Sequence, residues 1–128
     1  MVELGVNNSK LATCPTSPNC VSSDAADGDH HIEPFRLAGP LVEAWRMTQS
    51  LVATLPRTKI ITVENNYLHA ECRSALFGFV DDLELYLRPE ERIIAVRSAA
   101  RLGYTDFGVN RKRVEQLHSE LLRKGVIK

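Results

Sequence analysis

The sequence lacks several features that would assign it to a functional class at once. It carries 16 basic and 16 acidic side chains, so no net charge attracts it to nucleic acid, and we expect no nucleic-acid partner. No apolar run approaches the ~20 residues that a membrane-spanning helix needs. Residues 1–12 have neither the basic start nor the apolar stretch of a signal peptide. These absences favour a soluble protein in the cytoplasm, with a periplasmic or envelope location as the alternative.

Cysteine is also scarce, since three residues are too few for a disulfide framework in a chain of this size. The residues that invite comparison with a zinc site are Cys14, Cys20, His30 and His31. Five residues separate the two thiols, and neighbouring histidines rarely bind one ion together. These four are therefore weak metal candidates, and we expect no cofactor. The two cysteines are either buried thiols or, in an exported protein, one short disulfide.

The composition is otherwise that of a globular protein, with 44% hydrophobic and 25% charged residues. A chain of 128 residues predicts a single domain. Residues 1–10 are predicted to be a mobile N-terminus. Residues 11–39 contain three prolines and show no periodicity, so we expect an irregular arm that is docked on the domain. The single domain is thus predicted to span residues 11–128.

Periodicity appears after Pro40, where apolar residues recur at helical spacing until Pro56. Four runs of strand-like residues follow, at 59–64, 67–75, 82–88 and 92–98. Their short connections predict a four-stranded antiparallel meander. A last helix is expected to begin at Asn110 and to end at Gly125. The predicted class is α+β, with two helices packed on one face of the meander and a polar second face open to water or a partner.

The most unusual stretch is residues 97–113, where the last strand leads through two glycines into the last helix. Cations in the first turn of a helix oppose its dipole unless an anion is present, and the free N–H groups there bind anions. The predicted anion-binding residues are Arg97, Ser98, Arg101, Tyr104, Asn110, Arg111 and Arg113. Alternatively, the cations form a structural network with acidic side chains. The candidate acidic partners are Asp81, Asp82, Glu84 and Asp106.

Two further patterns indicate other functions. Asp82 and Glu84 share one face of a strand, and with His69 or Glu71 they could bind a divalent cation or serve a hydrolase as an acid–base pair. Cross-strand ion pairs are the simpler interpretation. The apolar connection 76–80 is either an exposed tip that contacts a protein or a membrane surface, or a loop folded over the end of the core.

None of these patterns identifies an enzyme class. The leading hypothesis is therefore non-catalytic binding of a small anion, or of an anionic group on a protein partner, at residues 97–113. The hydrolase and the interaction module remain alternatives, and the oligomeric state stays open.

Three segments carry a resemblance to a known family. They lie at residues 14–23 (CPTSPNCVSS), 77–84 (FGFVDDLE) and 97–113 (RSAARLGYTDFGVNRKR). Over residues 11–122 the chain resembles the family called domain of unknown function 1499. That family occurs in bacteria and plant plastids, and some members are membrane-tethered or exported. The resemblance implies a bacterial or plastid protein but no activity, cofactor or site residue, and from residues 1–12 we expect no leader like that of the tethered members.

Overall fold

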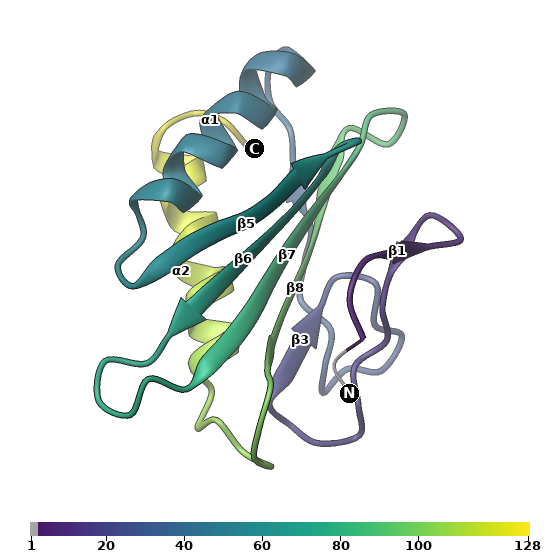
Figure 1. Cartoon of the computed structure of the whole chain (residues 1–128). Helices are drawn as coiled ribbons and strands as arrows, with labels where there is room; N and C mark the ends of the chain where they lie inside the picture. Colours follow the sequence, from purple (N-terminus) through teal and green to yellow (C-terminus); the bar gives the residue numbers. More distant parts are fainter. Residues whose placement is uncertain (1–2) are drawn as a thin grey trace.

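The computed structural model describes residues 3–128, and Figure 1 shows the arrangement of their helices and strands. The elements are β1 (Val6–Asn7), β2 (Lys10–Leu11), β3 (Cys20–Ser22), β4 (Phe35–Arg36), α1 (Leu41–Thr54), β5 (Thr58–Glu64), β6 (Tyr67–Arg73), β7 (Val80–Arg88), β8 (Ile93–Ala100) and α2 (Val109–Arg123). The fold is therefore α+β, as predicted. Of the N-terminus that we expected to be mobile, residues 1–2 lie outside the described residues, and β1 and β2 form a small hairpin.

The main sheet has six strands, not the four that we predicted. Strands β5 to β8 form the expected antiparallel meander, with a tight turn at Asn65 and Asn66, both of which have positive φ. The additional strands β3 and β4 come from the arm, and both pair antiparallel with β8. They were missed because segments of two or three residues are too short to show alternation.

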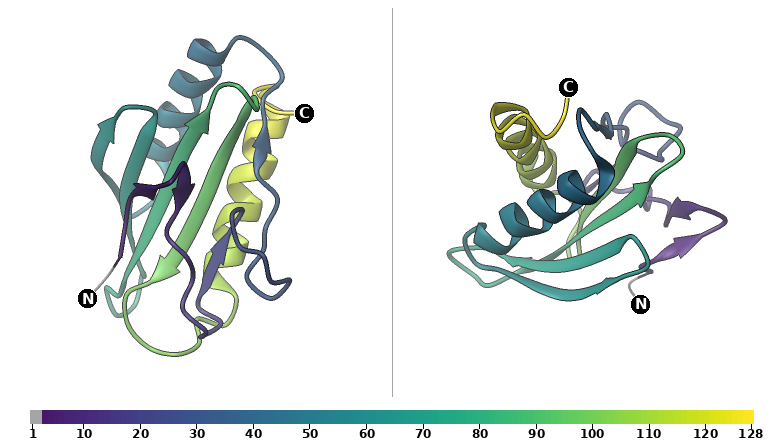
Figure 2. Two further views of the ribbon diagram at one scale, coloured as in Figure 1. Left: turned by 90° about the vertical axis from the view of Figure 1, so that its right-hand side faces the viewer. Right: turned by 90° about the horizontal axis from the view of Figure 1, so that it is seen from above.

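Both helices lie on one face of the sheet, as predicted, and Figure 2 shows this in the view from above. Apolar side chains at helical spacing fix this packing, because burying one leucine or valine contributes about 1.5–3 kcal/mol. The buried apolar residues of the two helices are Ala44, Val52, Val114, Leu117 and Leu121. They meet inward-facing side chains of the meander such as Leu83 and Leu85, which are completely buried.

The opposite face of the sheet is polar, as expected, but only part of it is open to solvent. The N-terminal arm covers part of it, and Figure 2 shows the β1–β2 hairpin away from the two helices. The backbone N–H of Gly5 donates to Glu84 at 2.7 Å, and Arg97 donates to the carbonyl of Thr13 at 3.2 Å. The arm thus encloses charged side chains of β7 and β8 that the alternation of these strands turns away from the helices.

Candidate functional site

The residues predicted to bind an anion do not converge on one point. Neighbouring side chains of β8 point to opposite faces of the sheet, so Arg97 lies under the arm while Ser98 faces α2. Arg101 lies on the same face as Arg97, and Tyr104 is 71% exposed in the loop that follows. The sheet therefore separates the cations of β8 from those of α2.

Under the arm, Arg97 is paired with Glu84. The Nη1 of Arg97 lies 3.2 Å from Oε1 of Glu84, whose side chain is completely buried. The hydroxyl of Tyr67 donates to the other carboxylate oxygen. Burial, reinforced by this hydrogen bond, raises the pKa of Tyr67 above its ordinary value, so the hydroxyl keeps its proton. The carboxylate of Glu84 is thereby fully engaged by donors of the chain itself.

Next to this pair, Arg101 bridges two carboxylates. Its Nε and Nη2 donate to the two oxygens of Asp82, each at 2.8 Å, and Nη2 also lies 2.7 Å from Glu71. The Nε2 of His69 lies 2.7 Å from Asp82. Burial raises the pKa of Asp82, but the hydrogen bonds from Arg101 and His69 outweigh it and hold this pKa below the ordinary value. Asp82 therefore stays ionised and orients the guanidinium of Arg101.

On the helix side, Asn110 joins β8 to α2. Its Oδ1 accepts hydrogen bonds from Ser98 at 2.6 Å and from Arg113 at 2.7 Å. Arg113 also pairs with Asp81 at 2.9 Å. Burial raises the pKa of Asp81, opposed by the charge of Arg113. Since Asn110 is 1% exposed, its side chain is a buried link and not the N-cap that the sequence predicted.

A carboxylate of the chain itself accepts hydrogen bonds from the free N–H groups at the start of α2. The helix begins at Val109, after Gly108 in the left-handed region at φ 80°. Asp106 accepts from the backbone N–H groups of Gly108 and Asn110, each at 2.9 Å. Burial raises the pKa of Asp106, but these hydrogen bonds hold it below its ordinary value. Arg111 turns back to the arm and donates to the carbonyls of Asp29 and His31. Asp106 thus occupies the place of the anion that we expected there.

The acidic residues proposed for a hydrolase lie on one face of β7, as the alternation predicted. Asp82 and Glu84 are 1% and 0% exposed, and both carboxylates accept hydrogen bonds from neighbouring side chains. Within residues 3–128, no group of three or more His, Cys, Asp or Glu side chains lies close enough together to hold a metal ion. The side chains of this face form ion pairs across the sheet instead.

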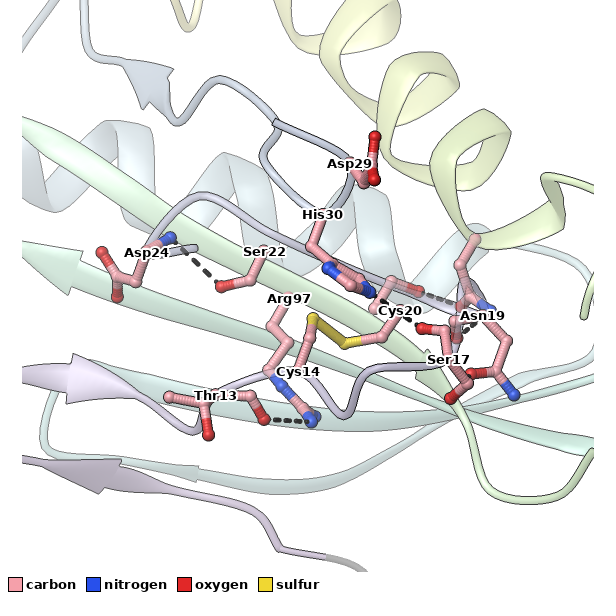
Figure 3. The surroundings of a disulfide bond; sticks show 12 residues. Thr13, Cys14, Ser17, Asn19, Cys20, Ser22, Asp24, Asp29, His30 and Arg97 are labelled. Carbon is pink, nitrogen blue, oxygen red and sulfur yellow. Dashed lines mark hydrogen bonds between the residues drawn. A yellow bond between two sulfur atoms is a disulfide. The ribbon is translucent and has the colours of Figure 1, made fainter. Parts of the chain in front are cut away.

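The two cysteines of the weak zinc candidate form a disulfide. The sulfur atoms of Cys14 and Cys20 lie 2.05 Å apart, and Figure 3 shows the bond at the start of β3, beside Arg97. Cys72 is buried and free. Burial raises the pKa of its thiol, which makes it a poor nucleophile.

The two histidines of that candidate have separate partners. The Nε2 of His30 lies 2.8 Å from the carbonyl of Ser17, and its Nδ1 lies 2.6 Å from Asp27. Both contacts raise the pKa of His30. His31 contacts Glu33 at 3.0 Å, and this contact raises the pKa of His31. The two cysteines are thus bonded to each other, and each histidine contacts partners of its own. The four side chains share no binding partner.

The disulfide loop holds the loop between β8 and α2. Asn19, which is 3% exposed, lies within the disulfide loop, and its Nδ2 donates to the carbonyl of Gly103 at 2.8 Å. The backbone carbonyl of Asn19 accepts from the N–H of Ala100 at 3.0 Å. Gly103 has φ of 85°, which side chains other than hydrogen disfavour, so it forms the turn of that loop. Residues 14–20 thus fix where residues 101–108 lie.

At the lower end of Figure 1, the β6–β7 loop and the β8–α2 loop lie at the same end of the sheet. Seven large apolar side chains are exposed there, with exposed fractions between 46% and 87%. We call this surface the apolar end, and its residues are Leu76, Phe77, Phe79, Leu102, Tyr104, Phe107 and Val109. The sequence indicated the first loop. It gave no sign of the second, because apolar residues in a glycine-containing loop have no periodicity to reveal their exposure.

Between the two loops lies a groove of about 730 Å³. Its lining includes six large apolar side chains, namely Phe77, Phe79, Val80, Leu102, Phe107 and Val109. Arg101 and Asp106 also line the groove, and Ala100 contributes to it from the end of β8. This volume is within the range of about 300–1,000 Å³ that is usual for small-molecule sites.

Comparison with known proteins identifies one family. The family model described as "Protein of unknown function (DUF1499)" matches residues 10–121, which include every residue of the apolar end. No curated protein and no solved structure matches the chain. Over residues 3–128, none of the helices has the length and apolar character needed to cross a membrane.

Proposed function

Because the chain belongs to the DUF1499 family, whose function is unknown, we propose a function from its surface: it is a non-catalytic module that docks on anionic phospholipid membranes through the apolar end. The observation that carries this proposal is the exposure of seven large apolar side chains on two adjacent loops. Monomeric soluble proteins rarely expose contiguous patches of this kind without a binding role.

The chemistry of these side chains suits the edge of a bilayer. Leucine and phenylalanine gain about 1.5–3 kcal/mol each when fully removed from water. Tyr104 is 71% exposed, and tyrosine is enriched where headgroups meet acyl chains. Phe77 and Phe79 lie with their ring centroids 5.6 Å apart, so they form one wedge and not two separate contacts. Loops of this composition can enter the interface without a spanning helix.

The rim of the apolar end is basic, which favours an anionic surface over a neutral one. Arg57, Lys59 and Arg73 line a groove beside the β6–β7 loop, together with one acidic residue, Glu71. On the other side, Lys112 is exposed in the first turn of α2. Each Lys or Arg close to an anionic membrane contributes about 1 kcal/mol of attraction.

The two other hypotheses have less support. An anion at residues 97–113 would have to compete with Glu84, Asp82 and Asp81 for the guanidinium groups that these carboxylates already engage. A hydrolase would have to expose Asp82 and Glu84, which are enclosed. We therefore favour a protein that is not an enzyme.

The disulfide indicates the cellular compartment in which the protein resides. Disulfide bonds persist in oxidising compartments and are rare in the cytosol, where thiols are kept reduced. The Cys14–Cys20 bond therefore supports an exported protein, and we propose a periplasmic or envelope location in place of the cytoplasmic one that the sequence favoured.

The test is co-sedimentation of the protein with vesicles of phosphatidylcholine, alone or mixed with phosphatidylglycerol. We expect binding to the mixed vesicles and a loss of at least about tenfold in the Phe77→Ser/Leu102→Ser double variant, since 1.4 kcal/mol is a factor of ten. Val42→Ser is the matched apolar control, because Val42 is 83% exposed and Leu102 is 78% exposed. Val42 lies in the first turn of α1, which starts at the opposite end of the sheet, so this variant should bind like the parent.

A second pair of variants tests the basic rim. Lys112→Gln should weaken binding to the mixed vesicles about fivefold, the loss expected for about 1 kcal/mol. Lys124→Gln, at the far end of α2, should have no effect. Failure of the parent protein to sediment with mixed vesicles would overturn the proposal. Self-association lost in the double variant, with no vesicle binding, would instead identify a second copy of the chain as the occupant.

A further inference from the structure

We propose that a basic groove beside the apolar end binds the phosphate of one membrane phosphatidic acid, so that the protein selects a phosphomonoester headgroup over the phosphodiester of phosphatidylglycerol. This inference rests on the proposed function, because it names the lipid that the docked protein recognises. It goes further, since attraction to an anionic surface needs only charge, whereas selection needs a site. The groove has a volume of about 510 Å³, and its polar lining consists of Arg57, Thr58, Lys59, Glu71, Arg73 and Ser74.

The three cations of the basic groove come from the start of β5 and the end of β6. The N–H of Arg73 donates to the carbonyl of Arg57 at 2.9 Å, and Nε of Arg57 donates to the carbonyl of Arg73 at 3.2 Å. Lys59 is the cross-strand partner of Glu71, which lies two residues before Arg73 and on the same face of β6. The register of the two strands therefore gathers three positive charges at one corner of the sheet. Like charges placed this close repel one another unless an anion lies between them.

These cations, unlike the arginines of residues 97–113, are not engaged by carboxylates. The carboxylate of Glu71 lies 2.7 Å from Nη2 of Arg101 but 3.7 Å from Nη2 of Arg73, which is too long for a hydrogen bond. Neither Arg57 nor Lys59 forms an ion pair with any carboxylate of residues 3–128. The groove thus presents donors of positive charge that a ligand can engage without displacing an internal partner.

Ser74 adds a neutral donor and connects the basic groove to the apolar end. Its Oγ accepts from the N–H of Phe79 at 3.0 Å, and its hydroxyl hydrogen has no acceptor among residues 3–128. Ser74 and Gly78 line both this groove and the groove of the apolar end. The β6–β7 loop, at the lower left of Figure 1, thus has an apolar surface on one side and a basic one on the other. When Phe77 and Phe79 enter the bilayer interface, the basic groove lies at the level of the lipid phosphates.

The set of donors favours a phosphomonoester. Such a group carries about −1.5 to −2 charge at pH 7 and has three acceptor oxygens, whereas a phosphodiester has about one charge and one acceptor fewer. The guanidinium groups of Arg57 and Arg73 can each donate two parallel hydrogen bonds to a phosphate, and Lys59 adds a point charge. The second ester group of a phosphodiester would leave part of this donor set unused. Phosphatidic acid is therefore the anionic phospholipid to which the groove is complementary.

The experiment compares two kinds of vesicle, in which phosphatidylcholine is mixed with phosphatidic acid or with phosphatidylglycerol and the zeta potentials are adjusted to be equal. Equal potentials remove the difference in general attraction, so the ratio of the two dissociation constants reports the headgroup itself. In co-sedimentation at about 0.15 M salt, we expect the parent protein to bind the phosphatidic acid vesicles at least about fivefold more tightly. Equal affinities would overturn the proposal.

The variant Arg73→Lys locates the recognition, because it keeps the charge of the groove but loses the paired donors of the guanidinium. The side chain of Arg73 is 56% exposed, so we expect the fold to be unaffected. The preference for phosphatidic acid should fall to less than about twofold, while binding to phosphatidylglycerol vesicles stays within about twofold of the parent. A preference that is unchanged in this variant would place recognition outside the groove and overturn the proposal.

The matched control is Lys112→Gln, in the first turn of α2 and outside the basic groove. This variant removes a charge from the other side of the apolar end. It should weaken binding to both kinds of vesicle by a similar factor and leave the ratio unchanged. A ratio that falls as far in Lys112→Gln as in Arg73→Lys would show that the preference follows total charge, and would overturn the proposal.

A soluble ligand separates this inference from the proposed function. Dihexanoyl phosphatidic acid, titrated calorimetrically below its micelle-forming concentration, presents the headgroup without a membrane. We expect the full chain to bind it at least about fivefold more tightly than dihexanoyl phosphatidylglycerol or inorganic phosphate. Inorganic phosphate that binds equally well would identify a site for free phosphate and overturn the assignment to a lipid.

The two assays together distinguish the possible failures. Docking on vesicles with no preference between the headgroups would leave the proposed function standing and overturn the headgroup site. Binding of soluble phosphatidic acid by a protein that does not sediment with either kind of vesicle would leave the headgroup site standing and overturn membrane docking.

Discussion

Glu84 of β7 and Arg97 of β8 are direct cross-strand partners, and their ion pair lies at 3.2 Å with 0% and 4% of the two residues exposed. The pair lies on the sheet face away from the helices, where the N-terminal arm covers it. Gly5, which precedes the arm, and Thr13 of the arm each contribute a backbone hydrogen bond to it. These contacts make the charged pair the point at which the arm is attached to the sheet.

We predict that Glu84→Gln lowers the free energy of unfolding by about 3–5 kcal/mol, because it leaves the charge of Arg97 buried without a counterion. Urea denaturation measures this change. Glu43→Gln is the control, since Glu43 pairs with Arg46 on the exposed face of α1 and should change stability by less than about 0.5 kcal/mol. Replacing both Glu84 and Arg97 by Met should recover part of the loss. Equal effects of the two single variants would contradict the prediction.

The disulfide should stabilise the fold by closing a short loop of the unfolded chain. For a loop of this length, the Cys14→Ser/Cys20→Ser double variant is expected to lose about 2 kcal/mol of stability. The measurement is urea denaturation with and without a reductant. Reductant should bring the parent protein to the level of the double variant and leave that variant unchanged. A parent protein insensitive to reductant would show that the bond makes no contribution.

Stability should depend on pH through His30, whose pKa is raised in the folded protein by the Ser17 carbonyl and by Asp27. Protonated His30 donates to both partners, and a neutral ring can donate from one nitrogen alone. The contribution is therefore fully present below the unfolded pKa of 6.5 and is lost as the pH rises through the higher folded value.

The measurement for His30 is urea denaturation at a series of pH values between about 6 and 8. The parent protein should lose stability across this window, and His30→Gln should remove most of the dependence. His31→Gln is the neighbouring control. The pKa of His31 is also raised, but its contact with Glu33 is exposed, so the change should be smaller. A parent protein of constant stability across the window would refute this assignment.

Local patterns of the sequence were sufficient for the long elements. The alternation around Leu68, Leu83 and Leu85 reports which face each strand buries, because a strand repeats every two residues whatever its partners are. The helical spacing between Pro40 and Pro56 likewise located α1, which spans Leu41–Thr54. Four strands, two helices and their order follow from such signals alone.

The short strands and the partners of the charged residues could not be predicted in this way. β3 and β4 exist because the edge of β8 offers hydrogen bonds to segments more than fifty residues away in the chain. The sequence showed a cluster of cations at residues 97–113, yet the pleat of β8 sends Arg97 and Ser98 to opposite faces. From the sequence, Asp106 is one of the candidate acidic partners of those cations, and only the folded loop places it on the N–H groups of α2.

The α+β class, the meander and the helix faces can be predicted from local patterns, since these features depend on periodicities within a few residues. Three features depend instead on long-range contacts: which carboxylate engages each arginine, how the arm covers the polar face, and that Leu76 and Phe107 share one exposed end. Those relationships join residues distant in the chain. Their physical basis is the removal of particular groups from water, which depends on what the rest of the chain places over them.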